Sequence, residues 1–579
     1  MMNRRAFLHY TGAASLISTG IISPSTLLAK NDFPEFDSFE KLVENLIKLN
    51  DERVPKIMEL QDRNPGSKYY GGVHDSWKIF TPGSTGALIK ILAISFIQPH
   101  SKFHLNESLI EPMELAIRYL LKVQHDDGTI DLLSTNFHST PDTAFVVEPL
   151  CATYKLLRRA ENEELKNILG LLERFLKRAG EAFIVGGVHT PNHRWVVSMA
   201  MSRLNELFPD ERYIKRINEW LREGIDIDAD GQYEERSTYI YTPLTNRCLV
   251  TMAKLLKRPE LLEPVRKNLD MTLYYIHPNG EVATEASGRQ DQFRVGFMEH
   301  YYVPLRYMAL NDQTGQFANL VSQIEKTVPE KLSTYLVYLL EDNIYANSLP
   351  TPQPLPDNYL KEFPNSKLAR IRKGNIDATV LADNPTFFTL SKGKAVLASV
   401  RLASAFFGRG QFKAETVERA GDSFILKWEF EWGYFQPLPE GEKPNYDIPF
   451  DEDRKRRDKS EVQKIKAQVT VSESNRIFEL DFELEGTDNV PLAVEMAFRN
   501  GGTLTGVEIP KTIGATHFEK SFLLKNGTGK YSFEDDEIEF GTGIAEHEWT
   551  AIRGSLPKPD GDCVYLTGFT PFKKKITIG

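Results

Sequence analysis

Cysteine is scarce in this chain, and the few that occur lie far apart. Only Cys151, Cys248 and Cys563 are present among 579 residues. An odd number of widely spaced cysteines excludes a disulfide framework and a C-x-x-C metal site. An excess of positive charge is missing too, because the net charge is -10 and the sequence pI is about 5.8. Nucleic-acid binding therefore has no electrostatic support.

Long hydrophobic runs are also lacking. The apolar run over residues 13–22 is too short to cross a bilayer, which takes about 20 residues. Paired arginines, Arg4 and Arg5, precede this run, and residues 27–29 resemble a cleavage site. The pattern predicts an export signal over residues 1–30, of the twin-arginine type or an ordinary secretory type. We therefore expect a periplasmic or secreted protein.

The length exceeds what one hydrophobic core usually serves, so two or three domains are expected. Residues 31–347 carry a helical period. The apolar side chains of Met113, Ala116, Ile117 and Leu120 recur at the spacing of one helix face. Further helices are predicted over residues 195–207, 213–223, 243–256 and 261–275.

Short glycine-bearing turns punctuate these helices at intervals of about 50 residues, the length of a helical hairpin with its connections. Such a quasi-repeat predicts an α/α toroid, complete or incomplete, whose loops on one face line a cleft. An irregular helical bundle is the alternative, because it has the same periodicity. The turns are Asp127-Gly128, Gly186-Gly187, Asp230-Gly231 and Asn279-Gly280.

The pattern changes after a proline-rich stretch. Residues 348–369 are predicted to form a stiff linker. Residues 370–579 contain runs that alternate with period two, such as 424–432 and 477–484, and predict an antiparallel β-sandwich. The charged run over residues 451–459 is interpreted as a solvated loop. The predicted fold class is therefore α+β and multidomain, with an N-terminal toroid and a C-terminal sandwich.

Four consecutive polar or aromatic side chains begin one of the helices: Asn192, His193, Arg194 and Trp195. An amide and a guanidinium can neutralise a carboxylate, and a histidine can move a proton near neutral pH. A tryptophan can stack on a sugar ring. These groups suit proton abstraction beside a sugar carboxylate, with Arg289 as a further cation. A polar helix start with Asn192 as its N-cap is the structural alternative.

Two tyrosines, Tyr239 and Tyr241, follow the next predicted helix and are candidates for the base. A phenol has a pKa of about 10 and needs a nearby cation to act as a base. Arg236, Arg247 and Arg289 are the candidate cations. Ordinary packing is the alternative role for either tyrosine. Asn136 and His138 form another polar cluster that either lines the same cleft or belongs to an ordinary loop.

Alternating carboxylates precede the tyrosines. Asp226, Asp228 and Asp230, followed by Gly231, match the first half of a calcium-binding loop. The usual glutamate at the twelfth position is absent, and Glu234 is the tentative replacement. Calcium is therefore the expected cofactor, and a capped acidic turn is the alternative.

The pairing of Asn192-His193 with the later segment from Asp230-Gly231 through Glu235-Arg236-Ser237 to Tyr239 or Tyr241 resembles the heparinase II/III-type and alginate-lyase-type polysaccharide lyases. The resemblance implies an α/α toroid joined to a β-sandwich. It also implies that Asn192 and His193 neutralise a carboxylate while a tyrosine and a histidine exchange protons. Arg236 departs from the small residue common at its position. The three-aspartate loop suggests a calcium-using relative, such as a rhamnose–glucuronate lyase.

The predicted function is cleavage of a uronate-containing glycan by β-elimination, leaving a 4,5-unsaturated uronate. Candidate substrates are rhamnose-capped arabinogalactan, glycosaminoglycan and alginate, so the expected partner is an acidic polysaccharide. A glycoside hydrolase is one alternative, with Asp142 opposite Asp230 or Glu235 as its two carboxylates. A non-catalytic glycan-binding protein is the other.

Overall fold

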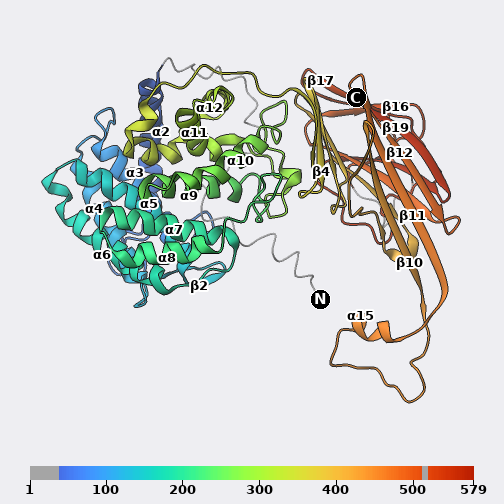
Figure 1. Ribbon diagram of the computed structural model, residues 1–579, viewed down its shortest axis with the longest axis horizontal. Coiled ribbons are helices and arrows are strands. Elements are labelled where there is room, and N and C mark those ends of the chain that lie inside the picture. The colour runs from blue at the N-terminus through green and yellow to red at the C-terminus, as the bar shows by residue number, and fades with distance from the viewer. Residues whose placement is uncertain (1–37, 512–518) are drawn as a thin grey trace. The chain divides into compact units, whose positions relative to one another are not determined.

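The computed structural model describes residues 38–511 and 519–579, so the predicted export signal lies outside the described residues. Two compact units make up the chain. The first runs to residue 276 and resumes over residues 280–355, and the second comprises residues 277–279 and 356–579. The first unit is helical and the second is built of strands (Figure 1). The predicted α+β multidomain fold is confirmed.

The first unit consists of helical hairpins (Figure 1). Its α-helices are α2 (Phe39–Glu59), α3 (Pro82–Ile97), α4 (Ile110–Val123), α5 (Thr140–Arg159), α6 (Lys166–Val185), α7 (Pro191–Leu207), α8 (Glu211–Arg222), α9 (Tyr241–Leu256), α10 (Leu262–Thr272), α11 (Tyr302–Asp312), α12 (Gly315–Thr327), α13 (Pro329–Leu332) and α14 (Leu336–Glu341). A short hairpin of β1 (Ile130–Leu132) and β2 (Asn136–Ser139) precedes α5.

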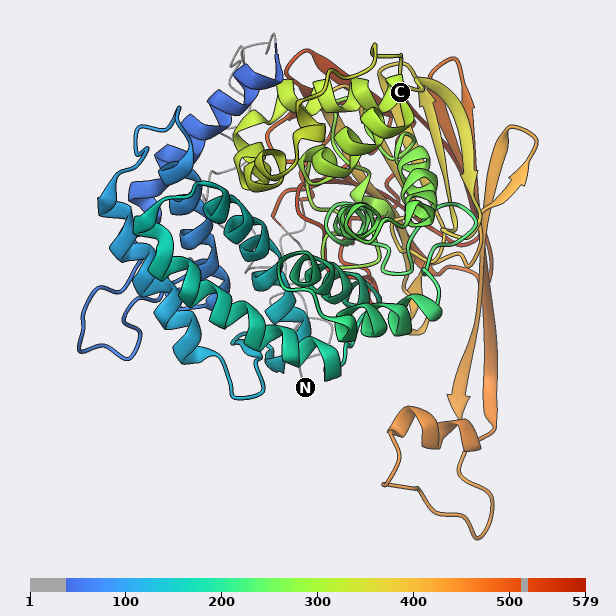
Figure 2. The same cartoon turned by 60° about the vertical axis from the view of Figure 1, so that its left-hand side comes forward.

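These helices form two rows. Helices α3, α5, α7 and α9 pack side by side in that order, and α4, α6 and α8 form the second row. Helix α7 is buried over most of its surface, whereas α8 buries one narrow stripe that contains Tyr213 and Ile217. A helix that is apolar all round belongs inside, and an amphipathic one belongs outside. In Figure 2 the hairpins follow an arc from α2 round to α12, which is the arrangement of an incomplete toroid.

Three of the glycine-bearing turns have the backbone conformation that requires glycine. Gly128, Gly231 and Gly280 have φ values of 87°, 99° and 84°. A Cβ atom at Gly231 would lie 2.7 Å from the carbonyl oxygen of Lys267, so the turn also packs closely on α10. These turns therefore fix the chain where it passes between successive hairpins.

The second unit contains two sheets. The first has the strand order β14-β16-β17-β19-β12-β11-β10-β9, and the second has the order β15-β18-β13-β7-β6-β5-β4-β3, with β8 added beside β7. The strands are β3 (Asn358–Phe363), β4 (Leu368–Lys373), β5 (Ile376–Leu381), β6 (Phe388–Lys392), β7 (Ala395–Ser404), β8 (Gly410–Gln411), β9 (Glu418–Ala420), β10 (Ser423–Phe435), β11 (Lys459–Ser474), β12 (Ile477–Gly486), β13 (Pro491–Phe498), β14 (Thr503–Thr505), β15 (Ser521–Leu523), β16 (Thr528–Phe533), β17 (Asp536–Gly541), β18 (Asp562–Phe569) and β19 (Phe572–Ile578).

One hydrophobic core lies between the two sheets. Phe388 and Val494 from one sheet and Phe482 and Val469 from the other belong to the same buried cluster. Pairing is antiparallel apart from β15 with β18, so the unit is a β-sandwich as predicted. The outer ends of β10 and β11 carry a connecting segment with the short helix α15 (Phe450–Asp453), seen in Figures 1 and 2.

Two local assignments differ from the prediction. Residues 358–363, inside the segment assigned to the linker, form strand β3. It is an edge strand with few buried side chains. The charged run after residue 450 contains α15 in addition to irregular chain. None of the helices over the described ranges combines the length and apolar character that a bilayer span requires.

Candidate functional site

The N-terminus of α7 places two buried polar side chains without complete hydrogen bonding. Thr190 is the N-cap, so Asn192 does not serve as the cap. The side chain of Asn192 is 2% exposed and accepts a hydrogen bond from Thr190 Oγ1 at 2.8 Å. Asn192 Nδ2 and His193 Nδ1 have no hydrogen-bond partner among the described residues. Buried polar atoms of this kind normally have partners, so this helix start has two groups ready for a ligand.

The next two residues of α7 face elsewhere, which corrects their predicted role in sugar binding. Arg194 forms salt bridges with Glu223 at 3.0 Å and Asp226 at 2.8 Å. Trp195 is fully buried, and its indole nitrogen donates to Asp226 at 3.0 Å. Successive helical residues point about 100° apart, so four in a row cannot share one cleft. Arg194 and Trp195 instead fasten the acidic loop to α7.

The acidic loop does not have the geometry of a calcium site. Asp226 is occupied by Arg194 and Trp195. Asp228 Oδ1 accepts the backbone N–H groups of Asp230 and Gln232, each at 2.9 Å. Within residues 38–511 and 519–579, no three His, Cys, Asp or Glu side chains are grouped to hold a metal, and Glu234, the fourth expected ligand, is exposed. The aspartates thus do not fit calcium in this structure, and the loop has the hydrogen bonding of a turn.

Arg289 connects the two segments that the sequence analysis expected to converge. Its Nε lies 3.2 Å from Oε1 of the buried Glu235, and its guanidinium carbon lies 5.8 Å from the ring centroid of Tyr241. Its charge also acts on His193, whose pKa it helps to lower. Arg289 is therefore close to both the α7 start and the α9 start.

Tyr241 begins α9 and is held by the same loop that carries Arg289. The amide of Gln290 donates to the Tyr241 hydroxyl at 2.6 Å. Burial raises the pKa of Tyr241, while Gln290 and the charge of Arg289 oppose that rise. Each candidate tyrosine has an arginine whose charge opposes the rise in its pKa, Arg289 for Tyr241 and Arg294 for Tyr239, so the partners of the two hydroxyl groups must distinguish them.

Tyr239 belongs to a different cluster. Its hydroxyl donates to Glu299 at 2.8 Å, and Lys331 donates to the same carboxylate oxygen at 2.8 Å. Its ring lies 4.7 Å from that of His300, which in turn contacts the Tyr335 hydroxyl at 2.5 Å. Burial and the charge of Glu299 raise the pKa of Tyr239. A hydroxyl already donated to a carboxylate is a poor base, so the arrangement favours Tyr241.

A buried aspartate fixes the position of the tyrosine segment. Asp291 is fully buried, and its Oδ2 accepts from Ser237 Oγ, Ser287 Oγ and the backbone N–H of Tyr239, each at 3.0 Å. Ser237 Oγ also accepts from the backbone N–H of Tyr241 at 3.0 Å. Asp291 thereby ties the loop before α9 to the loop that carries Arg289.

His193 is buried, and its burial determines its protonation state. Burial lowers the pKa of His193 to about 3, and the charges of His189 and Arg289 act in the same direction. Burial raises the pKa of Glu235, against the opposing effects of Arg289 and the Asn192 backbone N–H. The imidazole is therefore neutral at ordinary pH, with one ring nitrogen that can donate a hydrogen bond and one that can accept a hydrogen bond.

Asn136 and His138 lie in the β1–β2 hairpin, directly before α5. Asn136 Nδ2 donates to Asp142 at 2.8 Å, and His138 pairs with Asp127 at 2.7 Å while its ring stacks on His125. The contacts explain both side chains as parts of the β1–β2 hairpin.

Several residues of the site were not predicted. Gln290 stands beside the predicted Arg289, but a single sequence does not show that it reaches Tyr241. Glu299 and His300 lie in a short 3-10 helix, Met298–Tyr301, and Tyr335 ends another, Ser333–Tyr335; no sequence motif marked these residues. Their grouping with Tyr239 depends on contacts across distant parts of the chain.

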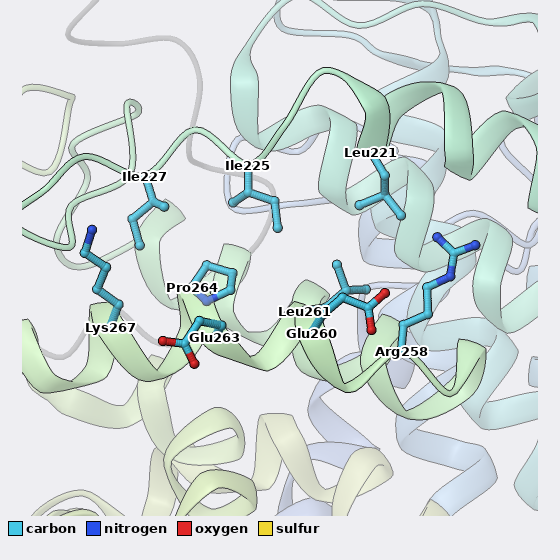
Figure 3. Close-up of a pocket in the computed structure, with 9 residues that line it drawn as sticks. All are labelled: Leu221, Ile225, Ile227, Arg258, Glu260, Leu261, Glu263, Pro264 and Lys267. Carbon is cyan, nitrogen blue, oxygen red and sulfur yellow. The ribbon is translucent and has the colours of Figure 1, made fainter.

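A groove of about 460 Å³ lies elsewhere on the first unit. Figure 3 shows Leu221, Ile225 and Ile227 facing α10, with Arg258 and Lys267 at opposite ends. Lys267 donates to the carbonyl of Asp228 at 2.7 Å and so braces the acidic loop. The groove is lined by none of the residues around Arg289.

Comparison with solved structures finds polysaccharide lyases. Heparinase III is 12% identical, with 99% of this chain and 88% of that chain covered and a TM-score of 0.53. The chondroitin AC lyase of Streptomyces coelicolor A3, in complex with chondroitin sulphate, is 13% identical, with 95% and 80% covered and a TM-score of 0.51. A Paenibacillus xanthan lyase is 10% identical, with 94% and 57% covered and a TM-score of 0.54.

Sequence comparison with protein-family models and with curated proteins finds no match. The structural likeness therefore rests on the arrangement of helices and strands over nearly the whole chain. It confirms the predicted resemblance at the level of fold. The chain has the toroid-plus-sandwich fold found in heparinase III, chondroitin AC lyase and xanthan lyase.

Proposed function

We propose that this protein is a polysaccharide lyase that cleaves a uronate-containing glycan by β-elimination. The observation that carries the proposal is the presence of unsatisfied Asn192 Nδ2 and His193 Nδ1 atoms beside the Arg289–Tyr241 pair. Together these groups supply hydrogen-bond donors for the carboxylate, a cation and a phenol that can transfer a proton. The fold shared with known lyases supports the same reaction class.

The reaction needs the proton on C5 of the uronate to be removed. Asn192 Nδ2 donates to the sugar carboxylate and, with the charge of Arg289, stabilises the negative charge that develops there. Tyr241 as phenolate accepts the C5 proton. The C5 electron pair forms the C4–C5 double bond while the C4–O bond breaks, and the leaving oxygen takes a proton. Tyr241, which holds the proton taken from C5, gives it to the leaving oxygen and becomes a phenolate again, while neutral His193 donates a hydrogen bond to the sugar carboxylate.

The cellular location belongs to the same proposal. Export to the periplasm or the medium rests on the arginine-led segment over residues 1–30. Calcium is not part of it, because Asp226 would have to leave Arg194 and Trp195 to bind an ion. No step of the proposed reaction uses a metal.

A panel of acidic glycans tests the proposal. The purified protein is incubated with alginate, glycosaminoglycans and rhamnose-capped arabinogalactan, and far-ultraviolet absorbance is followed together with new reducing ends. A lyase produces both signals in parallel. New reducing ends without absorbance indicate a hydrolase, and binding without either signal indicates a glycan-binding protein. Either of these results rejects the proposed reaction.

A further inference from the structure

A second group of cations lies inside the helical unit, apart from the Asn192 segment. Arg53 on α2, Lys90 on α3 and Arg247 on α9 all reach the short segment over residues 333–338. Arg53 donates to Ser333 Oγ at 3.5 Å, and Lys90 Nζ donates to the carbonyl of Thr334 at 3.1 Å. The guanidinium of Arg247 lies 4.7 Å from the ring centroid of Tyr338. Three distant parts of the chain thus bring positive charge to one place.

The carboxylates nearby are already engaged. Glu148 accepts from Arg203 at 2.7 Å and from the Tyr338 hydroxyl at 2.7 Å, and Arg247 lies 3.4 Å away. Arg203 also pairs with Glu341 at 2.7 Å. The two carboxylates of Glu148 and Glu341 are therefore matched against four cations. Arg203 and Arg247 contact these carboxylates, and Arg53 and Lys90 are the other two cations.

Arg53 and Lys90 have no carboxylate within salt-bridge distance in the described part of the chain. The Nε of Arg53 is buried and has no hydrogen-bond partner there. An unpaired buried cation is costly, and the cost falls when an anion binds. Burial and the charges of Arg53 and Arg247 lower the pKa of Lys90 to about 7, as expected for an uncompensated cluster. Arg53 and Lys90 each keep part of their surface exposed to solvent.

We propose that Arg53, Lys90 and Arg247 form a subsite for a second anionic group of the glycan, a carboxylate or a sulfate. The inference rests on the proposed function and extends it, because it requires a substrate with two acidic groups on different sugars. An oxyanion there would accept hydrogen bonds from the guanidinium groups and from the ammonium group.

A chain of contacts links this subsite to the candidate active site. The charge of Arg247 acts on Tyr335 and on His300. Tyr335 contacts His300, and the His300 ring lies 4.7 Å from that of Tyr239, two residues before Tyr241. The second anionic group would therefore lie on a sugar near the one whose proton is removed.

Anion binding without turnover tests the subsite. Thermal unfolding of the whole protein is measured with sodium sulfate and with sodium glucuronate, against sodium chloride at equal ionic strength. The variants are Arg53→Gln and Lys90→Gln, singly and together. The double variant Lys48→Gln/Lys56→Gln is the control, since both lysines are exposed on α2 and the charge change is the same.

We expect one or both oxyanions to raise the unfolding midpoint of the wild-type and control proteins. The double variant at Arg53 and Lys90 should need at least about ten times more anion for the same rise. In the absence of anion, that variant should unfold no earlier than wild type, because two repelling charges are gone. If sulfate alone raises the unfolding midpoint, the second anionic group of the glycan is a sulfate. If glucuronate raises it, that group is a carboxylate.

Two results would overturn the subsite: no stabilisation of the wild-type protein beyond that by chloride, or the same anion response in the double variant as in wild type. Neither depends on catalysis. If oxyanions bind at Arg53 and Lys90 while no glycan yields an unsaturated product, the lyase proposal fails and the subsite stands. If a glycan yields an unsaturated product but oxyanions do not bind at Arg53 and Lys90, the lyase proposal stands and the subsite fails.

Discussion

The carboxylate of Glu235 and the guanidinium of Arg289 form a salt bridge, with 3.2 Å between Oε1 and Nε. The carboxylate is buried, whereas the arginine side chain is 40% exposed. Buried Glu235 therefore holds the partly exposed guanidinium of Arg289 in place. The guanidinium lies next to Tyr241, and its charge acts on His193. This position suits a cation that binds an acidic substrate and stabilises a phenolate.

Replacing each tyrosine by phenylalanine separates their roles. Tyr241→Phe should lower kcat by about 10² to 10⁴, because it removes the proposed base. Tyr239→Phe removes a hydrogen bond to buried Glu299, so it should mainly reduce stability, by about 1–3 kcal/mol. Steady-state rates and thermal unfolding of both variants are the measurements. A larger rate loss in the Tyr239 variant would reverse the assignment.

Arg289→Gln should lower kcat/KM by about 100-fold, because a charge-stabilising group at the reacting carboxylate is lost. Arg294→Gln is the matched control, since Arg294 is exposed and its guanidinium lies 5.9 Å from the ring centroid of Tyr239. The control should retain most of the activity. Equal losses in both variants, measured on the same glycan, would mean that the position of the cation does not matter.

His193 should make the protein sensitive to mild acid. Its pKa in the folded protein is about 3, below its ordinary value of 6.5. As pH falls through that interval the unfolded chain takes up a proton that the folded one does not. Stability should therefore fall with pH, by at most about 1.4 kcal/mol per pH unit from this residue.

His193→Gln lacks this titration. Between pH 7 and pH 5 the variant should lose less stability than wild type, by up to about 2 kcal/mol. Thermal or urea unfolding at the two pH values measures the difference. Parallel losses in the two proteins would show that His193 is not buried in its neutral form.

Chelation of divalent ions should leave both activity and unfolding temperature unchanged. The acidic loop is held by protein hydrogen bonds, with Asp228 accepting two backbone N–H groups and Asp226 paired with Arg194. Turnover and thermal unfolding are measured with chelator and with added calcium. A loss that calcium alone restores would establish the cofactor expected from the aspartate spacing.

The sequence was most informative where local chemistry decides the structure. Pro191 marks the first residue of α7, and Gly128, Gly231 and Gly280 mark turns whose positive φ favours glycine. Period-two alternation likewise located β10 and β12. Each of these signals depends on neighbours in the chain and can be seen in one sequence.

The direction of individual side chains was less predictable. Asn192 and Trp195 are three residues apart on one helix, yet the first borders the candidate site and the second is buried against Asp226. The aspartate spacing matched a calcium loop, but the same spacing also builds a turn whose carboxylates accept backbone N–H groups. Whether a calcium loop or a turn forms depends on the partners of the aspartates. Here the partners of Asp226 are Arg194 and Trp195, and the spacing of the motif gives no information about them.

The most direct test measures unsaturated product formation from acidic glycans by wild-type protein and by the His193→Gln and Tyr241→Phe variants. The account predicts a rise in far-ultraviolet absorbance with at least one uronate glycan, matched by new chain ends. Both signals should be lost together in the two variants, while glycan binding persists. New chain ends without absorbance, or full turnover in both variants, would contradict β-elimination at this site.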